Sequence, residues 1–392
     1  MPRHHVTFPA EFLWGTATSA YQIEGGNENS DWAHFERTAG TRAAEPCRDA
    51  CDSWNRYRED LDIVHSLGLN AYRFSLEWAR IEPARGSISR DALAHYREMI
   101  DACRARGVLP VVTLHHFTIP QWLAEEGGFE SPDIVQRMVG YARVVSDALG
   151  ESIGVACTIN EPNVVAVYGY LAGVFPPQVT SWSRFARANE TLRACHRAMR
   201  DVLKEGPGLF PVGLTLSMQQ YEAISGFETQ MDSFRAEMED KYLADVRDDD
   251  FLGVQCYTKL LIGPGGVVAN PEGETTDMGY LFWPECVDYT VRRAIDLAKV
   301  PVIVTENGIG TADDAQRIRY LEGALDSLRR LLAVGLDVRG YFQWSLLDNF
   351  EWTYGYRPKF GIVSVDRTTF ARTPKPSAQW YADEVRNFFT TA

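Results

Sequence analysis

The sequence predicts an α/β fold, a single-domain (β/α)8 TIM barrel, on three observations. Short apolar runs rich in β-branched residues alternate with longer amphipathic segments, which is typical of βα units around a parallel sheet. Eight such runs occur in the 392 residues. No Pro-, Ser- or Gly-rich stretch has the composition of a linker. Length alone would allow two or three domains, but without a linker we expect one catalytic domain over residues 1–392.

The strands are expected where the apolar runs lie. These runs occupy residues 12–22, 71–78, 109–117, 155–162, 211–218, 251–258, 301–308 and 338–348. Residues 89–107 form a helix candidate, with Ala92, Tyr96 and Cys103 on one face and Gly107 as the expected C-cap. No repeat of fixed length accompanies the alternation, which argues against a solenoid.

Charge and composition exclude several classes of function. Lys and Arg number 39 against 53 Asp and Glu, a net charge of −14, so no basic stripe exists that could follow a phosphate backbone. The N-terminus has no basic segment followed by an apolar one, and no run of about 18 apolar residues occurs. We expect a soluble, cytoplasmic protein without a nucleic-acid or membrane partner.

The seven cysteines are scattered along the chain. Only Cys47 and Cys51 are close in sequence, and they lack the second ligand pair that a zinc site would need. Free thiols are therefore expected, and a redox role for this one pair stays open.

Polar side chains follow the expected strands at the point where each strand ends. The active site of a barrel lies at the C-terminal ends of its strands, so these residues are expected to converge. They are Gln22, Glu24, Arg73, Glu77, His115, His116, Asn160, Glu161, Tyr257, Glu306, Asn307 and Glu351.

Two glutamates stand out among them. Glu161, in "TINEP", and Glu306, in "VTENG", each end an apolar run and each adjoin an Asn. On the fourth and seventh strands of an eight-strand ring they would face each other across the mouth. Hydrolysis of a glycosidic bond needs such a pair, because one carboxyl protonates the leaving oxygen while the other stabilises or attacks the anomeric carbon.

Several motifs resemble glycoside hydrolase family 1, the retaining β-glycosidases, over nearly the whole chain. They are "FLWGTATSAYQIEGG", "YRFSLEWARI", "TINEP", "VTENG", "WSLLDNFEW" and "TPKPSAQWY". The resemblance implies that Glu306 is the nucleophile and Glu161 the acid/base. Arg73 and Tyr257 would support the ionised Glu306 through hydrogen bonds. Burial and the opposing carboxylate should raise the pKa of Glu161.

The resemblance also implies a sugar-binding set. The matching positions for sugar hydroxyls are Gln22, His116, Asn160 and Glu351, and the matching platforms are Trp344 and Trp352. His115 is expected to be a core histidine. The implied activity is hydrolysis of terminal non-reducing β-D-glucosides, extending to galactosides or fucosides, through a covalent glycosyl-enzyme that also permits transglycosylation.

The chain departs from the family pattern on the leaving-group side. Asn163 stands where many members have Trp, Phe117 and Thr118 stand where Trp and Asp are frequent, and "QC" at 255–256 replaces the commoner Asn-Tyr. Residues 262–284 look shortened, which predicts a more open entrance. The catalytic set is untouched.

Three other functions compete with this interpretation. A 6-phospho-β-glycosidase would replace Glu351, whose carboxylate repels phosphate. A non-catalytic carbohydrate-binding barrel would lack one of the two glutamates. A metal-dependent hydrolase would need His and Asp ligand pairs, whereas adjacent His115 and His116 face opposite sides of a strand. No metal or cofactor is expected. The glycone, the aglycone and the oligomeric state are left open by the sequence.

Overall fold

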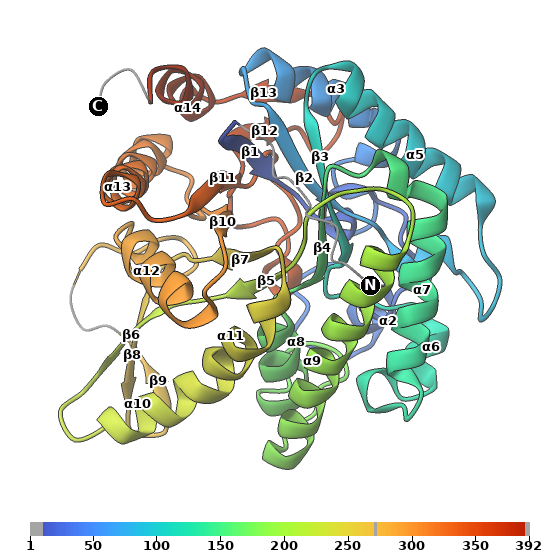
Figure 1. Ribbon diagram of the computed structural model, residues 1–392, viewed down its shortest axis with the longest axis horizontal. Helices are drawn as coiled ribbons and strands as arrows, with labels where there is room; N and C mark the ends of the chain where they lie inside the picture. Colours follow the sequence, from blue (N-terminus) through green and yellow to red (C-terminus); the bar gives the residue numbers. More distant parts are fainter. Residues whose placement is uncertain (1–10, 270–272, 389–392) are drawn as a thin grey trace.

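Eight parallel strands close into a barrel in the computed structural model, which describes residues 11–269 and 273–388 (Figure 1). The strands are β1 (Leu13–Ala17), β2 (Ala71–Ser75), β3 (Leu109–His115), β4 (Val155–Asn160), β5 (Val212–Ser217), β7 (Phe251–Gln255), β10 (Val302–Asn307) and β11 (Val338–Trp344). Each strand lies within one of the eight predicted runs, so the barrel prediction is confirmed.

The ring runs in the order β1-β11-β10-β7-β5-β4-β3-β2. The first and last strands close it, with Leu13 of β1 opposite Gly340 of β11. Because every strand is parallel to its neighbours, all eight C-terminal ends lie at one mouth of the barrel. The domain boundaries 1–392 stay a prediction, and their ends, residues 1–10 and 389–392, lie outside the described part of the chain.

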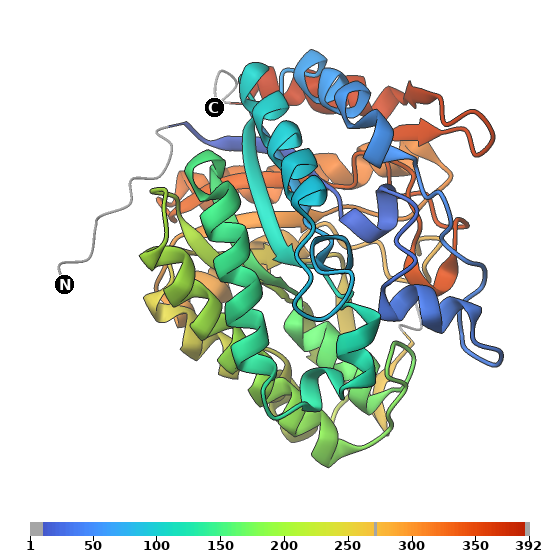
Figure 2. The same ribbon diagram turned by 90° about the vertical axis from the view of Figure 1, so that its right-hand side faces the viewer.

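Helices cover the outside of the barrel (Figures 1 and 2). The longer ones are α3 (Ser53–Ser66), α5 (Arg90–Ala105), α7 (Ile134–Leu149), α9 (Trp182–Glu205), α12 (Cys286–Ala298), α13 (Asp314–Ala333) and α14 (Pro376–Asn387). The shorter ones are α1 (Ala20–Ile23), α2 (Asp31–Arg37), α4 (Trp78–Ile81), α6 (Gln121–Glu125), α8 (Pro162–Ala166), α10 (Glu228–Arg235) and α11 (Lys241–Asp245).

Helix α5 is the helix predicted over residues 89–107. The Ser89 side chain accepts a hydrogen bond from the Ala92 N–H at its start, and Gly107 follows its end with φ +70°. The face carrying Tyr96 and Cys103 is buried, as predicted.

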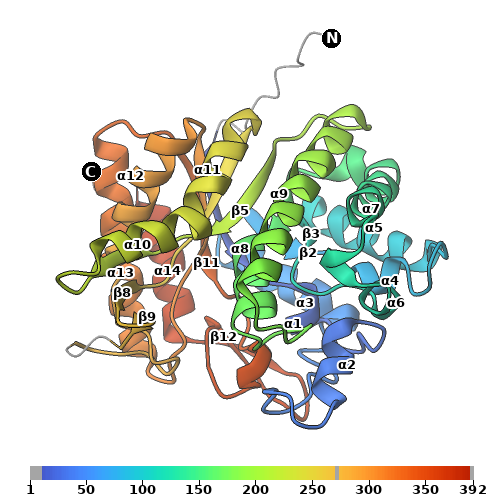
Figure 3. The same cartoon turned by 90° about the horizontal axis from the view of Figure 1, so that it is seen from below.

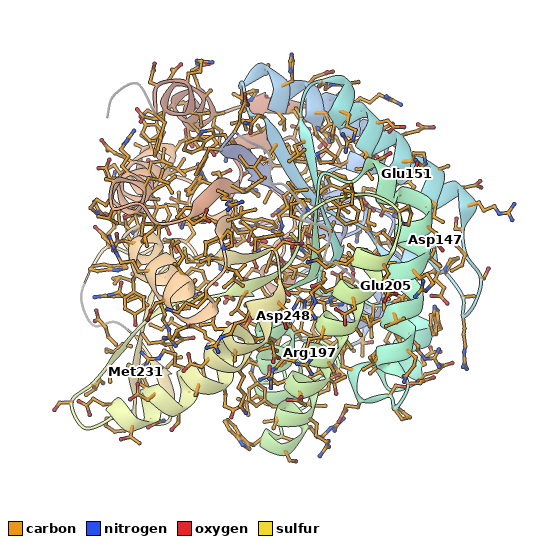
Figure 4. All side chains as sticks on the ribbon, viewed as in Figure 1. Asp147, Glu151, Arg197, Glu205, Met231 and Asp248 are labelled. Atoms are coloured by element: carbon orange, nitrogen blue, oxygen red, sulfur yellow. The ribbon has the colours of Figure 1, made fainter. Side chains whose placement is uncertain are left out.

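The core has two layers because strand side chains alternate between the two faces of the sheet. In β2, Tyr72 and Phe74 pack outward in the large cluster between strands and helices, whereas Ala71 belongs to the smaller cluster inside the barrel. The outer helices turn their charges to solvent, as Figure 4 shows for the labelled Asp147 and Glu205.

Two small sheets lie outside the barrel. Strands β6 (Gln220–Ala223), β8 (Lys259–Gly263) and β9 (Gly266–Val268) form a three-stranded sheet, which projects beside α10 in Figure 1. Strands β12 (Val363–Val365) and β13 (Arg372–Pro374) form an antiparallel pair near the C-terminus. None of the helices within residues 11–269 and 273–388 has the length and apolar character needed to cross a membrane.

A buried ion pair joins β13 to helix α3. Arg372 donates to both Asp60 oxygens, at 2.8 and 3.3 Å, and Ser53 donates to one of them at 2.7 Å. Burial raises the pKa of Asp60, and Arg372 counteracts that rise. Removal of one partner from such a pair leaves an uncompensated buried charge, which costs more than the pair itself contributes.

The Arg372→Met variant should therefore lose about 3–5 kcal/mol of the free energy of unfolding at neutral pH, measured by urea denaturation. The loss should shrink at acidic pH, because a protonated Asp60 needs no counter-charge. Arg386→Met is the matched control, since Arg386 and its partner Asp383 are about half exposed, and it should cost less than about 1 kcal/mol. Equal losses in the two variants would contradict the assigned role of the buried pair.

Candidate active site

A cavity of about 270 Å³ lies where the C-terminal ends of the strands meet the loops that follow them. Eight of the ten predicted site residues line it: Gln22, His116, Glu161, Tyr257, Glu306, Trp344, Glu351 and Trp352. The other two, Arg73 and Asn160, are fully buried and hydrogen-bond to residues of its lining. Figure 3 shows α1 and α8, which carry or adjoin lining residues, on the side of the molecule seen from below.

Local irregularities aim the two glutamates into this cavity. The register of β4 against β5 shifts between Cys157 and Asn160, just before Glu161. The register of β10 against β7 shifts between Val304 and Glu306. Such bulges redirect side chains and are frequent beside active sites. Glu161 also has φ +43°, a left-handed backbone that is rare for a residue with a side chain.

Glu306 is held by two donors. One Arg73 Nη donates to its Oε1 at 2.5 Å, and the Tyr257 hydroxyl donates to its Oε2 at 2.5 Å. Both carboxylate oxygens are therefore fixed, and charge-assisted hydrogen bonds of this length are the strong class. This is the arrangement expected from the sequence.

Asn160 connects Arg73 to Gln255 and His116 by hydrogen bonds. Its Oδ1 accepts from the second Arg73 Nη at 2.5 Å and from Gln255 Nε2 at 3.0 Å. Its Nδ2 lies 3.2 Å from His116 Nε2, and because an amide nitrogen donates, that ring nitrogen must accept. Burial, followed by the nearby Arg73 charge, holds the pKa of His116 well below its ordinary value, so the ring is neutral.

The two glutamates differ in how they ionise. Burial and then the charge of Glu306 raise the pKa of Glu161 well above its ordinary value. Burial also raises the pKa of Glu306, but Arg73 and Tyr257 counteract it. Glu306 therefore loses its proton first, and Glu161 keeps one to donate.

One end of the cavity offers further polar groups. Gln22 Nε2 donates to the Phe350 carbonyl at 2.7 Å and lies 3.3 Å from Glu351 Oε2. Burial and the charge of Glu306 raise the pKa of Glu351 to about 8. Trp344 and Trp352 both have rings nearly parallel to that of His116, with centroids 6.0 and 6.1 Å away. Hydroxyl-binding groups and flat apolar rings thus lie together.

Besides Arg73 and Asn160, four of the predicted strand-end residues lie outside the cavity lining: Glu24, Glu77, His115 and Asn307. Glu24 pairs with Arg80 at 2.8 Å, and both oxygens of Glu77 accept from the Thr118 hydroxyl at 3.0 Å. Asn307 donates to the Cys256 carbonyl at 2.6 Å. The prediction that these three converge on the site is wrong, because buried partners outside the cavity satisfy them. His115 is buried beside Phe129, as expected of a core histidine.

The cysteines are free and buried in the structure, as predicted. The Cys47 thiol donates to the Tyr21 carbonyl and the Cys51 thiol to the Asp348 carbonyl. Burial raises the pKa of both thiols, that of Cys51 to about 12, so neither is a ready thiolate.

Several residues in or next to the cavity escaped the sequence analysis. Gln255, which the sequence analysis noted only as a departure from the family pattern, donates to Asn160. Ser217 and Gln219 line the cavity after β5, and Tyr168, Tyr280 and Tyr354 line its outer part. Gln255 and Ser217 lie on barrel strands and the others on short helical turns or connecting segments, and no motif marks any of them. Strand alternation from Thr215 could have pointed to Ser217, but nothing local points to the tyrosines.

Metal-ligand chemistry has no counterpart in the described residues. Across 11–269 and 273–388, no group of three or more His, Cys, Asp or Glu side chains is placed to hold a metal ion.

The glycosyl hydrolase family 1 model matches residues 4–246 and 263–388. The chain belongs to glycosyl hydrolase family 1. It is 32% identical to beta-glucosidase A of Thermotoga maritima, over 97% of this chain and 98% of that one. It is 30% identical to beta-glucosidase A of Acetivibrio thermocellus, over 97% and 99%. The solved structure of beta-glycosidase BGL167 superposes with a TM-score of 0.91 at 40% identity, covering 97% of each chain.

The coupling between the two glutamates can be measured directly. In Glu306→Gln, the pKa of Glu161 should fall, because the like charge is gone and Arg73 is left without its counter-ion. Carbon-13 NMR titration of labelled glutamate side chains reports that pKa. Glu98→Gln, which removes a carboxylate that is 62% exposed, should leave it unchanged. An unaltered pKa in Glu306→Gln would show that the two carboxyls do not interact.

Proposed function

We propose that the protein is a retaining β-glucosidase that cleaves terminal non-reducing β-D-glucosides by double displacement. The observation that carries the proposal is the pair of carboxyls in one cavity, with Glu306 fixed by Arg73 and Tyr257. Burial and then the charge of Glu306 raise the pKa of Glu161 well above its ordinary value. The beta-glucosidase names of the curated relatives support the activity.

In the first step, Glu306 attacks the anomeric carbon while Glu161 protonates the departing oxygen. Because Arg73 and Tyr257 each hold one oxygen of Glu306, the nucleophile needs no reorientation before it attacks. The bond to the aglycone breaks, a β-linked sugar becomes α-linked to Glu306, and the aglycone leaves as a neutral alcohol.

In the second step, water replaces the aglycone. Once Glu306 is esterified, its negative charge is gone, which lowers the pKa of Glu161 and lets it act as a base towards water. Water attacks the anomeric carbon, Glu306 is released as a carboxylate, and the configuration returns to β. An alcohol in place of water would give transglycosylation.

The glycone is expected to bind beside Gln22 and Glu351, with Trp344 and Trp352 as platforms. Asn160 would reach the sugar 2-hydroxyl, whose hydrogen bond strengthens in the transition state. Galactosides and fucosides are proposed as further substrates, because the groups expected near O4 can both donate and accept. The cytoplasmic location stays a prediction.

A 6-phosphoglycoside is a poorer candidate for this cavity. With a pKa of about 8, Glu351 is largely uncharged at neutral pH, so repulsion by its carboxylate is a weaker objection than the sequence suggested. However, neither Lys nor Arg is among the described residues that line the cavity, and a phosphate dianion needs such a partner.

Stereochemistry tests the mechanism. The two carboxyls are expected about 5–5.5 Å apart, too close to seat a water between nucleophile and sugar. The first sugar released should then be the β-anomer, as seen by proton NMR within the first minutes. Added methanol should divert part of the intermediate to methyl β-glucoside. If the α-anomer formed first, both the double displacement and the nucleophilic role of Glu306 would be refuted.

The acid role of Glu161 predicts a dependence on the leaving group. Glu161→Ala should lose about 10²–10⁴-fold in kcat/KM on alkyl glucosides, and much less on dinitrophenyl glucosides, whose leaving group needs little protonation. The wild-type rate should fall as pH rises through the pKa of Glu161, and the variant should lack that alkaline limb. Glu98→Ala serves as a carboxylate control outside the cavity. Equal losses on both substrates would reduce Glu161 to a structural residue.

A further inference from the structure

The inward and outward alternation of strand β4 changes phase just before Glu161. Ala156 packs in the outer cluster and Cys157 in the interior one, as regular alternation requires. Ile159 should then face inward like Cys157, yet it packs in the outer cluster. Asn160 points inward again, where it accepts from the buried guanidinium. The alternation is therefore reset by one residue between Cys157 and Asn160.

The register of β4 against β5 shows the same irregularity. From Cys157 to Asn160, β4 advances by three residues while β5 advances by two, from Gly213 to Thr215. One residue of β4 is thus extra, which defines a bulge. The Thr158 hydroxyl lies inside this interval, 3.4 Å from the Gly213 carbonyl.

A histidine on helix α9 contacts Thr158 from outside the barrel. His196 Nδ1 lies 2.8 Å from Thr158 Oγ1, and both side chains are fully buried. His196 Nε2 lies 3.2 Å from Asp249 Oδ2, without the angles of a hydrogen bond. The tautomer with its proton on Nε2 suits both neighbours, because Nδ1 then accepts from the hydroxyl and Nε2–H faces the carboxylate.

Asp249 is itself fixed by two other elements. The N–H of Leu214 in β5 donates to its Oδ2 at 3.1 Å, and Arg200 of α9 donates to its Oδ1 at 3.2 Å. The ring of His196 is therefore held between a fixed carboxylate and the extra residue of β4.

These groups can affect chemistry only through the backbone of β4. Thr158, His196 and Asp249 all lie outside the cavity lining. The left-handed turn at Glu161 begins three residues after Thr158, and the Glu161 N–H donates to the Thr215 carbonyl at 2.9 Å. A bulge that relaxed towards regular pairing would change the side to which the next residues face and would move the start of this turn.

From this geometry we propose that Thr158 and His196 are positioning residues for Glu161, because their hydrogen bond holds the β4 bulge and so fixes the direction of the proton donor. The inference rests on the proposed function, since it takes Glu161 as the acid. A displaced acid slows the departure of leaving groups that need protonation, and it has little effect on those that leave as stable anions.

The test is an isosteric substitution that removes only the hydroxyl. In the full chain, Thr158→Val should lower the ratio of kcat/KM for benzyl β-D-glucoside to that for dinitrophenyl β-D-glucoside by about tenfold, because only the benzyl alcohol needs a well-placed acid. Thr158→Ser, which keeps a hydroxyl, should hold the ratio within about twofold of the wild type. Thr158→Ala repeats the comparison if the Val variant does not fold.

A matched control separates positioning from stability. Thr290 in helix α12 is also fully buried, and its hydroxyl donates to the Cys286 carbonyl at 2.7 Å. Thr290→Val therefore deletes a buried hydroxyl of the same kind away from β4. It should lower the midpoint of thermal unfolding and leave the ratio of the two substrates unchanged.

A double-variant cycle tests whether the two residues act together. His196→Leu should lower the substrate ratio as Thr158→Val does. The variant carrying both changes should lose no more than either single variant, because each breaks the same hydrogen bond.

The outcomes separate the two proposals. An unchanged ratio in Thr158→Val, or an equal fall in Thr158→Val and Thr290→Val, overturns the positioning role and leaves the glucosidase intact. Additive losses in the double variant overturn the joint action of Thr158 and His196. If the wild type does not hydrolyse dinitrophenyl glucoside, the proposed function itself is overturned, and the positioning role with it.

Discussion

The buried guanidinium of Arg73 is the group on which the catalytic end of the barrel depends. It donates to Glu306 near the end of β10 and to Asn160 at the end of β4, so one cation joins two strands that are not neighbours in the ring. The positive charge of Arg73 would be unfavourable without partners, because the side chain is fully buried. The Glu306 carboxylate on one side and the Asn160 amide oxygen on the other compensate the charge of Arg73. That charge in turn sets the order in which the two glutamates ionise.

Three residues with a left-handed backbone line the same cavity. Phe117, Glu161 and Trp352 all line it, and all have φ between +43° and +69°. A left-handed backbone is unfavourable for residues with side chains and persists only where the surroundings enforce it. Phe117 and Glu161 come within two residues of the end of β3 and β4, whose pairing fixes the chain just before each turn. The regular sheet thus supplies the stability that lets its loops adopt conformations suited to binding.

The barrel and the meeting of Glu161 and Glu306 in one cavity could be predicted from the sequence because both leave strong local patterns. Apolar runs mark the strands, and each glutamate follows its run directly. The predictions that Glu24, Glu77 and Asn307 converge on the site failed for a different reason. Glu77 follows β2 closely and Glu24 ends the short helix after β1, yet Arg80 and Thr118 satisfy them outside the cavity. Position along a strand therefore predicts proximity to the mouth, but not which side chains remain available to a substrate.

The part of the cavity that the sequence could not predict is also the part built from loops. Gln22, Asn160 and Glu306 lie on or next to barrel strands and are fully or almost fully buried. Tyr168 and Tyr354 lie beyond them on irregular turns and are partly exposed. Bond cleavage requires fixed geometry, which strand ends provide, whereas a leaving group must depart at every turnover. Tyr168 and Tyr354 leave that part of the cavity wall partly open to solvent, so no fully buried polar network has to break for a group to pass them.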